Sequence, residues 1–393
     1  MTKGWETNEQ RAPARILIVT PRYVPLVGGV ENHVREVVRR MPPDLDVTIL
    51  TTDATGSLPT EDAVDGVRVL RSRAYPRGAD YYVAPSLYGI VARGGWNLVH
   101  VQSYHTAVAP LAMLAARSAH IPYVITLHGG GHSSQLRNAL RSTQHRMLRP
   151  LLAHAEKIIS VAEFEADSFS RRLGIPLERF VVIPNGSDLP SPGDSAPARR
   201  PEARPTIASV GRLEKYKGHH RVVEAMPELL RLGPDTELHI VGSGPYEQAI
   251  GRLAQRLGVA DHVRIYSIPS SDRVAMAEAL RGFSLFVLMS EFETHPLAVM
   301  EALALGCPAL VADTSGLREL AQHGLARALP LDSTPSDIAT AISQELHHPT
   351  QVPPLTLPSW DECAAGVLAV YREVLASRFL SARVARIGDA DVV

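Results

Sequence analysis

The sequence contains very little cysteine. Only Cys307 and Cys363 occur among 393 residues, and they form no spaced cluster. We therefore expect neither a disulfide framework nor a structural zinc site, which fits a reducing, cytoplasmic compartment. Long apolar runs are also missing, since none reaches the roughly 18 residues of a membrane span. The polar segment 1–15 lacks the pattern of a secretory signal.

An excess of charge of one sign is absent too, because the formal net charge is −1. Nucleic acid is therefore not an expected partner. Lysine is scarce: only four of the 40 basic residues are lysines, and two of these, Lys215 and Lys217, lie within three positions. This concentration makes the segment RLEKYKGHH, residues 212–220, a candidate binding site for an anion.

Short β-branched runs alternate with segments of helical length. Apolar runs of this length that do not alternate with polar residues suit strands buried on both faces, and the alternation with helices predicts an α/β protein with doubly wound parallel sheets. The predicted strands lie at 16–20, 47–50, 67–70, 98–101, 123–126 and 158–160, and then in the runs TIASVG, LHIVG, VRIY, FSLFVLM and PALVAD.

The alternation of strands and helices stops at residues 191–205, which are rich in proline, serine and charge. We interpret this segment as an interdomain linker. We therefore predict two Rossmann-like domains with a cleft between them. Ligands of open parallel sheets bind at the carboxyl ends of the strands, so the turns there are the candidate site. The expected segments are a tail at 1–13, domains at 14–190 and 206–358 joined by the linker 191–205, a helix at 359–378 and a tail at 379–393.

Two turns of the first domain contain glycines. Gly28 and Gly29 precede a predicted helix, where backbone N–H groups could approach a ligand, although the dinucleotide pattern GxGxxG is absent. His128 follows a buried strand and precedes a glycine-rich turn. It is either a ligand contact or a structural histidine. The spacing of His128 and His132 could suggest a metal, but the intervening glycines disfavour a regular helix, so no metal site is expected.

Two turns of the second domain are candidates for phosphate binding. Arg212 follows a strand, and Lys217 comes five residues later. A planar guanidinium and a compact ammonium together suit a diphosphate, and the alternative is a solvated loop. Gly242 and Gly244 flank a tight turn, over which a nucleotide could lie, although turn geometry alone would also explain them.

The stretch EFETHPLAVMEALALGCP, residues 291–308, contains two glutamates. Pro296 suits the first turn of a helix, so Glu293 is expected in the preceding loop and Glu301 on the helix. The helix start, at Leu297 and Ala298, could accept an anion, while the carboxylates could accept hydrogen bonds from hydroxyls. A nucleotide sugar supplies both kinds of group.

Through the order of five short motifs, the chain resembles the retaining glycosyltransferases of family 4, which have the GT-B fold. The motifs are GG before a helix, HG after a strand, GRxxxxKG, GxGP and ExxxxxxxE. The resemblance spans about residues 14–378 and includes PNGSD at 184–188, which is similar to a PNG-x-D segment of that family. It implies a hexosyltransferase-type enzyme that moves a sugar from a nucleotide-sugar donor to a hydroxyl acceptor, with retention and without metal or another cofactor. The acceptor could be a glycan, a lipid or a small natural product.

The same resemblance implies roles for individual residues. Arg212 and Lys217 would hold the donor diphosphate, while Glu301 would accept hydrogen bonds from the ribose. Glu293 would contact the donor sugar, and His128 would lie near the reaction centre. The leaving phosphate would take the acceptor's proton on the donor's front face, so neither glutamate is expected to be an acid or base. The remaining candidates are Gly28, Gly29, Gly242, Gly244, His295, Leu297 and Ala298 for the donor, and Gly129, His132 and Asn185 for the acceptor or sugar.

The chain departs from the common family pattern at His295-Pro296, where many members have Phe-Gly. Proline cannot donate an N–H, so His295 could contact the sugar or a phosphate instead, or could serve as a structural cap. The segment 266–272 also lacks the usual Leu-Gly, which leaves the contacts to the base open.

A basic segment at 134–155 places Arg137, Arg141, His145 and Arg149 at four-residue spacing, and places Met147 on an adjacent apolar face with three leucines. It could be a solvated face, a helix on the inner membrane surface or a site for an anionic acceptor. Two alternative functions stay open. An epimerase of the same fold would alter the donor without any acceptor, and a non-catalytic sugar-nucleotide binder would not turn it over.

Overall fold

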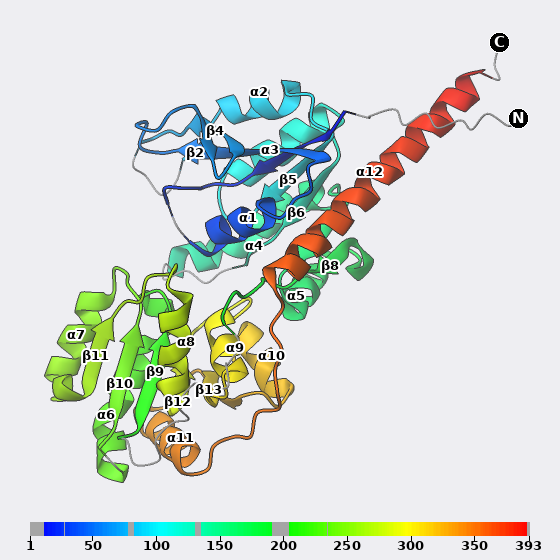
Figure 1. The fold of residues 1–393 in the computed structure, drawn as a ribbon. Helices are drawn as coiled ribbons and strands as arrows, with labels where there is room; N and C mark the ends of the chain where they lie inside the picture. Colours follow the sequence, from blue (N-terminus) through cyan, green and yellow to red (C-terminus); the bar gives the residue numbers. More distant parts are fainter. Residues whose placement is uncertain are drawn as a thin grey trace, which may run out of the picture.

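The computed structural model describes residues 12–26, 28–77, 82–129, 135–190, 204–233 and 235–390, with side chains omitted for 135–142 and 379–390. The predicted tail at 1–13 and linker at 191–205 lie almost entirely outside the described residues, as does His132. Two α/β domains lie one above the other, and the last helix runs along the first of them (Figure 1).

The first domain is built on a sheet in which eight strands are described, in the order β3-β4-β2-β1-β5-β6-β7-β8. Only the pairing of β3 with β4 is antiparallel among its ladders. The elements are β1 (Ala14–Val19), α1 (Gly29–Val38), β2 (Leu45–Asp53), β3 (Glu61–Val64), β4 (Val67–Arg73), α2 (Ser86–Arg93), β5 (Leu98–Gln102), α3 (Val108–Ser118), β6 (Tyr123–Thr126), α4 (Gln135–Leu152), β7 (Ile158–Ser160), α5 (Glu163–Leu173), η1 (Leu177–Arg179) and β8 (Phe180–Val182).

Successive residues of a strand point to opposite faces, so β1 contributes to two cores. Leu17 and Val19 pack with α2, α3, α4 and α5 on one face. Ile16 and Ile18 pack with α1 and α12 on the other. Both faces of this sheet are therefore covered by helices, as the non-alternating apolar runs predict.

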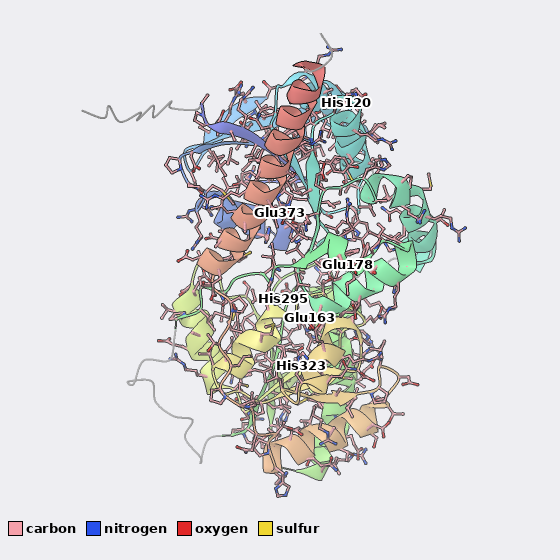
Figure 2. The ribbon with its side chains drawn as sticks, turned by 90° about the vertical axis from the view of Figure 1, so that its right-hand side faces the viewer. His120, Glu163, Glu178, His295, His323 and Glu373 are labelled. Atoms are coloured by element: carbon pink, nitrogen blue, oxygen red, sulfur yellow. The ribbon has the colours of Figure 1, made fainter. Side chains whose placement is uncertain are left out.

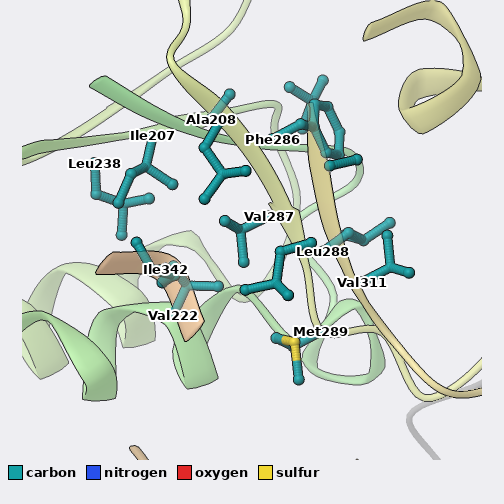
Figure 3. Close-up of a cluster of buried hydrophobic side chains, with 14 of the residues drawn as sticks. Ile207, Ala208, Val222, Leu238, Phe286, Val287, Leu288, Met289, Val311 and Ile342 are labelled. Atoms are coloured by element: carbon teal, nitrogen blue, oxygen red, sulfur yellow. The ribbon is translucent and has the colours of Figure 1, made fainter. Parts of the chain in front are cut away.

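The second domain repeats the plan on a parallel sheet in the order β11-β10-β9-β12-β13-β14. Its buried core, part of which Figure 3 shows, includes Ile207 and Phe286 of the sheet with Val222 and Ile342 of α6 and α11. The elements are β9 (Thr206–Val210), η2 (Lys215–Lys217), α6 (His219–Leu232), β10 (Glu237–Val241), α7 (Glu247–Arg256), η3 (Ala260–His262), β11 (Val263–Tyr266), α8 (Arg273–Gly282), β12 (Leu285–Leu288), α9 (Leu297–Ala304), β13 (Ala309–Ala312), α10 (Ser315–Gln322), β14 (Arg327–Leu329) and α11 (Pro335–His347).

The chain then returns to the first domain through α12 (Trp360–Ala390), which is drawn red in Figure 1. Trp360, Val367 and Tyr371 of this helix are buried against α1 and the first sheet. The backbone stays helical to Ala390, whereas the sequence predicts an end at 378 and a tail beyond it. No helix in the part of the chain that is described is both long and apolar enough to cross a membrane.

Tyr371 also ties this helix to the sheet through a buried hydrogen bond. Its hydroxyl lies 2.7 Å from Nδ1 of His100 on β5. We expect Tyr371→Phe to lower the free energy of unfolding by about 1–2 kcal/mol, because a buried polar contact is lost. Urea denaturation followed by tryptophan fluorescence measures this. Tyr88→Phe, which loses an exposed contact to Ser118, is the control, and an equal effect of both substitutions would contradict the prediction.

The basic helix α4 differs from the prediction. His145 is buried and packs against Tyr104 and Phe169, while Nε of Arg149 donates to the carbonyl oxygen of Leu173 at 2.6 Å. His145 thus faces the protein, whereas Arg149 stays exposed and Met147, expected on a core-packed stripe, is 74% exposed. The reason is that α4 packs on α3 and α5 through Leu148 and Leu152. The side chains of Arg137 and Arg141 lie outside the described part of the chain.

Candidate functional site

The carboxyl-end turns of the two domains meet at the domain boundary. The hydroxyl of Thr294, in the loop after β12, donates to the carbonyl oxygen of Gly129, in the turn after β6. Beside this contact the rings of Phe164 and Phe292 lie 5.9 Å apart. Figure 2 shows His295 at this boundary between the two domains. The predicted site residues of both halves are thereby brought to one region.

Lys217 and Glu293 form an ion pair at this region. The lysine Nζ lies 2.7 and 2.8 Å from the two carboxylate oxygens, and both side chains are largely buried. Burial acts to lower the pKa of Lys217, but the charge of Glu293, the nearby Tyr216 and the hydrogen bond to Glu293 together outweigh it, so the pKa is raised and the ammonium stays charged. Sequence analysis predicts both residues as ligand contacts; it does not predict that they pair.

The backbone geometry around Lys217 depends on close packing. Gly218 follows it with φ 75°, a left-handed conformation, and a side chain there would overlap the carbonyl oxygen of Met289. Lys217, the last residue of η2, is thus held against the end of β12. Arg212, by contrast, is 67% exposed and lies 3.4 Å from the carboxylate of Glu214. It reaches outward from the same loop.

Gly242 and Gly244 have a structural explanation. A Cβ at Gly242 would overlap the carbonyl oxygen of Gly211, and one at Gly244 would meet that of Leu213. The loop after β10 therefore lies directly on the loop after β9, with the N–H of Leu213 donating to the oxygen of Ser243 at 3.0 Å. This packing supports the loop that contains Arg212, whether or not a nucleotide lies over it.

Glu301 lies on α9, in contact with the segment that leaves the first domain. Its Oε1 accepts a hydrogen bond from the Ser187 hydroxyl at 2.8 Å and another from the Arg273 guanidinium. The guanidinium also pairs with Asp188, at 2.7 Å. Burial raises the pKa of Glu301, and Arg273 and Ser187 oppose this shift. The carboxylate is thus already hydrogen-bonded to Ser187 and Arg273, and ribose hydroxyls would have to share it with them or displace them.

The start of α9 is less open to an anion than predicted. Pro296 is the N-cap, and α9 begins at Leu297. The N–H of Leu297 donates to the oxygen of His295 at 2.8 Å, and the N–H of Val299 donates to that of Pro296 at 3.0 Å. Ala298 lies between them. The turn at His295-Pro296 therefore already uses the N–H groups of Leu297 and Val299, which a phosphate would otherwise accept.

His295 itself is half-buried, with its Nδ1 atom buried. Burial lowers its pKa to about 4, so the ring is neutral at pH 7. Within the described residues, its Nδ1 has no hydrogen-bond partner. A buried polar atom without a partner is costly.

His128 belongs to a cluster of neutral histidines. It has φ 47°, which is uncommon for a residue other than glycine, and its Nε2 donates to Oε1 of Gln102 at 2.7 Å. Its pKa is well below the usual range because of burial and the nearby His33, His100 and His105. The ring of His33 stands edge-on to it, with centroids 4.7 Å apart. His128 is thus suited to hydrogen bonding and not to acting as a cation.

Asn185, predicted for the acceptor or sugar, and Gly28 and Gly29, predicted for the donor, lie on segments next to His33. Asn185 accepts a hydrogen bond from Nδ1 of His33 at 2.9 Å, which joins the PNGSD segment to α1. Gly28 is the N-cap of α1, and Gly29 has open space where a side chain would lie. His132 is not among the described residues. No group of three or more histidine, cysteine, aspartate or glutamate side chains suited to a metal ion occurs in the described part of the chain.

Sequence reasoning did not identify Glu165, Thr294, Arg273 or His33. Glu165 and Arg273 occupy first turns of α5 and α8, where charged residues are common and carry no special signal. Thr294 and His33 could have been found by their position, since one lies between Glu293 and His295 and the other lies four residues after Gly29.

Comparison with known proteins agrees with this geometry. A model described as Glycosyltransferase Family 4 matches residues 27–190, and one described as Glycosyl transferases group 1 matches residues 193–353. A glycogen synthase of Mycobacterium tuberculosis is 27% identical, over 85% of this chain and 86% of its own. A D-inositol 3-phosphate glycosyltransferase of Catenulispora acidiphila is also 27% identical, over 93% and 97%.

Solved structures show the same architecture. The sucrose-phosphate synthase of Thermosynechococcus elongatus has a TM-score of 0.73 at 20% identity and covers 93% of this chain and 100% of its own. Anabaena HepE has a TM-score of 0.65 at 18% identity and covers 96% and 100%. The predicted GT-B fold is thereby confirmed. The chain belongs to the glycosyltransferases in which a Glycosyltransferase Family 4 domain precedes a glycosyl transferases group 1 domain.

Proposed function

We propose that this glycosyltransferase uses a nucleotide sugar as donor, retains the anomeric configuration and needs no metal ion. The observation that supports this most strongly is the buried Lys217–Glu293 pair at the domain boundary. It places a cation for a diphosphate beside a carboxylate for sugar hydroxyls. Related proteins support the donor class: a relative from Mycolicibacterium smegmatis is named as GDP-mannose-dependent, and HepE is described in complexes with UDP and UDP-glucose.

In this proposal each side chain has one task. Lys217 and the outward-reaching Arg212 bind the diphosphate, and Glu301 accepts the ribose hydroxyls. Glu293 holds Lys217 and contacts the donor sugar. His295 offers its Nδ1 to a hydroxyl of that sugar, and the neutral His128, whose Nε2 already donates to Gln102, accepts a hydrogen bond through Nδ1 near the anomeric carbon.

The chemistry then follows from where charge develops. As the glycosidic bond breaks, negative charge grows on the leaving diphosphate, and fixed cations in a partly dry site stabilise it. The phosphate oxygen takes the proton of the acceptor hydroxyl on the same face of the sugar, which gives retention. Neither Glu293 nor Glu301 acts as an acid or base, because Lys217 and Arg273 already engage them.

The acceptor is a hydroxyl compound that enters from the first domain, past Gly28, Gly29 and Asn185. An anionic or lipid-linked acceptor at the membrane surface remains part of this proposal through the exposed Arg146 and Met147 of α4. Binding to anionic liposomes that weakens with salt is the expected sign, and equal binding to neutral liposomes would contradict it.

A panel of nucleotide sugars tests the central proposal. We expect one of them to raise the melting temperature most, since stabilisation grows with ligand concentration over the dissociation constant. That donor should release its nucleoside diphosphate in EDTA, and NMR of the product should show a retained anomeric configuration. An epimerised donor without acceptor would favour the epimerase, and binding without turnover would favour a non-catalytic binder.

A further inference from the structure

The backbone N–H and the carbonyl group of Gly129 form hydrogen bonds to different domains. Its N–H donates to Oε1 of Glu165, on α5, at 2.6 Å. Its carbonyl oxygen accepts a hydrogen bond from the hydroxyl of Thr294, which belongs to the second domain. The residue directly after His128 is therefore fixed on one side by a carboxylate and on the other by the opposite domain.

This double contact explains why the position is glycine. A Cβ at Gly129 would lie 2.6 Å from Oε1 of Glu165 and 3.1 Å from Oγ1 of Thr294. The first distance is shorter than real Cβ contacts, so the Glu165 side chain would have to move. The HG pair thus combines a histidine in an uncommon backbone conformation with a glycine that admits two polar neighbours.

Glu165 is built into the first domain at this point. Its side chain is buried, with only 2% of the residue exposed, and its second oxygen accepts the N–H of Val161 at 3.0 Å. The two oxygens therefore join the turn after β6 to the turn after β7. Glu165 lies in the first turn of α5, where the helix dipole favours a negative charge.

We propose that Glu165 is a positioning residue for sugar transfer: its carboxylate fixes the His128–Gly129 turn so that Thr294 can close the second domain onto it. This inference rests on the proposed function, which places His128 at the reacting sugar. Glu165 does not touch substrate. It acts through the peptide of Gly129, and its loss affects the orientation of His128 and the contact to Thr294.

The ionised carboxylate of Glu165 is the form that fixes the His128–Gly129 turn. Ionised Glu165 accepts both N–H groups, whereas a protonated carboxyl directs an O–H at one of them and loses that bond. Burial raises its pKa to about 7. The elements packed here also carry charged groups, namely Glu163, Asp167, Arg171 and Arg172 on α5 and Arg318 and Glu319 on α10, and the adjoining turns carry His128 and His295. Burial lowers the pKa of both histidines, so neither neutralises the carboxylate near pH 7.

Activity and stability should then depend on pH in opposite directions. kcat should rise as the pH rises through about 7, because the turn is fully fixed when Glu165 is ionised. The folded chain keeps this proton to a higher pH than the unfolded chain does, since the pKa of Glu165 is raised from its ordinary value of 4.5 to about 7. The contribution of Glu165 to stability is therefore full below about 4.5 and is lost as the pH rises through 7.

The test is Glu165→Gln in the full chain. One amide oxygen can replace one carboxylate oxygen, so we expect kcat at pH 8 to fall about tenfold, with the donor KM within about twofold of wild type. The rise of kcat through pH 7 should vanish. In protein labelled with ¹⁵N-glycine, the Gly129 amide signal should titrate near pH 7 in wild type only, which is measured without any turnover.

Glu345→Gln is the matched control. Glu345 is 3% exposed on α11, and its carboxylate accepts the backbone N–H of Thr350 at 2.9 Å and lies 3.4 Å from the Arg327 guanidinium. It should keep wild-type kcat and its pH dependence. Wild-type kcat and pH profile in Glu165→Gln, or a Gly129 signal that does not titrate in wild type, would overturn the inference. Absence of transfer in wild type would instead count against the proposed function.

Thr294 provides a second test if Glu165→Gln does not fold. Thr294→Val removes the hydroxyl at nearly constant volume, and we expect about a tenfold loss in kcat. Thr294→Ser restores the hydroxyl and should recover activity to within about twofold. Equal activity of the valine and serine variants would show that the contact to Gly129 does not position the turn.

Discussion

We expect Lys217→Met to lower kcat by about 10²–10³-fold, because it removes the largely buried cation that the proposed function places at the leaving diphosphate. The magnitude is that of removing one preorganised group from the site where transition-state charge develops. Arg212→Ala should have a smaller effect, since that side chain is mostly exposed and water screens its charge. Single-turnover kinetics with saturating donor separates the chemical step from binding.

The same substitution also weakens the fold, and this must be separated from catalysis. Lys217→Met leaves Glu293 buried without its cation, which costs about 3–5 kcal/mol when one partner of a buried pair is removed. The double variant Lys217→Met with Glu293→Gln removes both charges. We expect it to regain most of the lost stability but none of the lost turnover.

Lys215→Ala is the control for this experiment. Lys215 lies two residues away in η2 and is exposed, so its loss should change kcat by less than about twofold. If Lys217→Met kept wild-type kcat, or if the double variant regained turnover together with stability, Lys217 would be a structural residue and the diphosphate site would lie elsewhere.

The sequence predicted most of the fold because the buried strands are strongly marked. Runs such as ILIVT and FSLFVLM are apolar on both faces, and they form the central strands β1 and β12. The edge strands β3, β8 and β14 were missed because they are only three or four residues long and mostly half-buried or exposed. The face of α4 was assigned by spacing alone, which cannot tell which side meets α3 and α5.

The candidate site was predicted in part for a different reason. Strand order places the turns at one edge, so Lys217, Glu293, Glu301 and His128 could be assigned to the cleft from the chain alone. Their partners could not. The Lys217–Glu293 pair joins residues 76 positions apart, and Ser187 reaches Glu301 across 114 positions. Such contacts depend on how the loops pack, and this packing leaves no local pattern in the sequence.

Glu301→Ala should raise the dissociation constant for the preferred nucleoside diphosphate by about 100-fold. Two ribose hydroxyls would lose a charged acceptor, and a hydrogen bond to a charged group contributes about 1.5–3 kcal/mol. The variant should still fold, because Arg273 keeps its contact of 2.7 Å to Asp188 after the carboxylate is removed. Isothermal titration calorimetry measures the dissociation constant, and circular dichroism checks the fold.

A 2′-deoxy analogue of the same nucleotide identifies the atoms involved. The wild type should bind it about tenfold more weakly than the ribonucleotide, because one hydroxyl donor is missing. In Glu301→Ala the two ligands should bind equally, since the acceptor that distinguishes them is gone. Ser187→Ala removes a competing donor but leaves the carboxylate, so it should keep the preference for ribose. A tenfold preference that survives in Glu301→Ala would mean that another residue accepts the ribose hydroxyls, and α9 would then contribute its helix start alone.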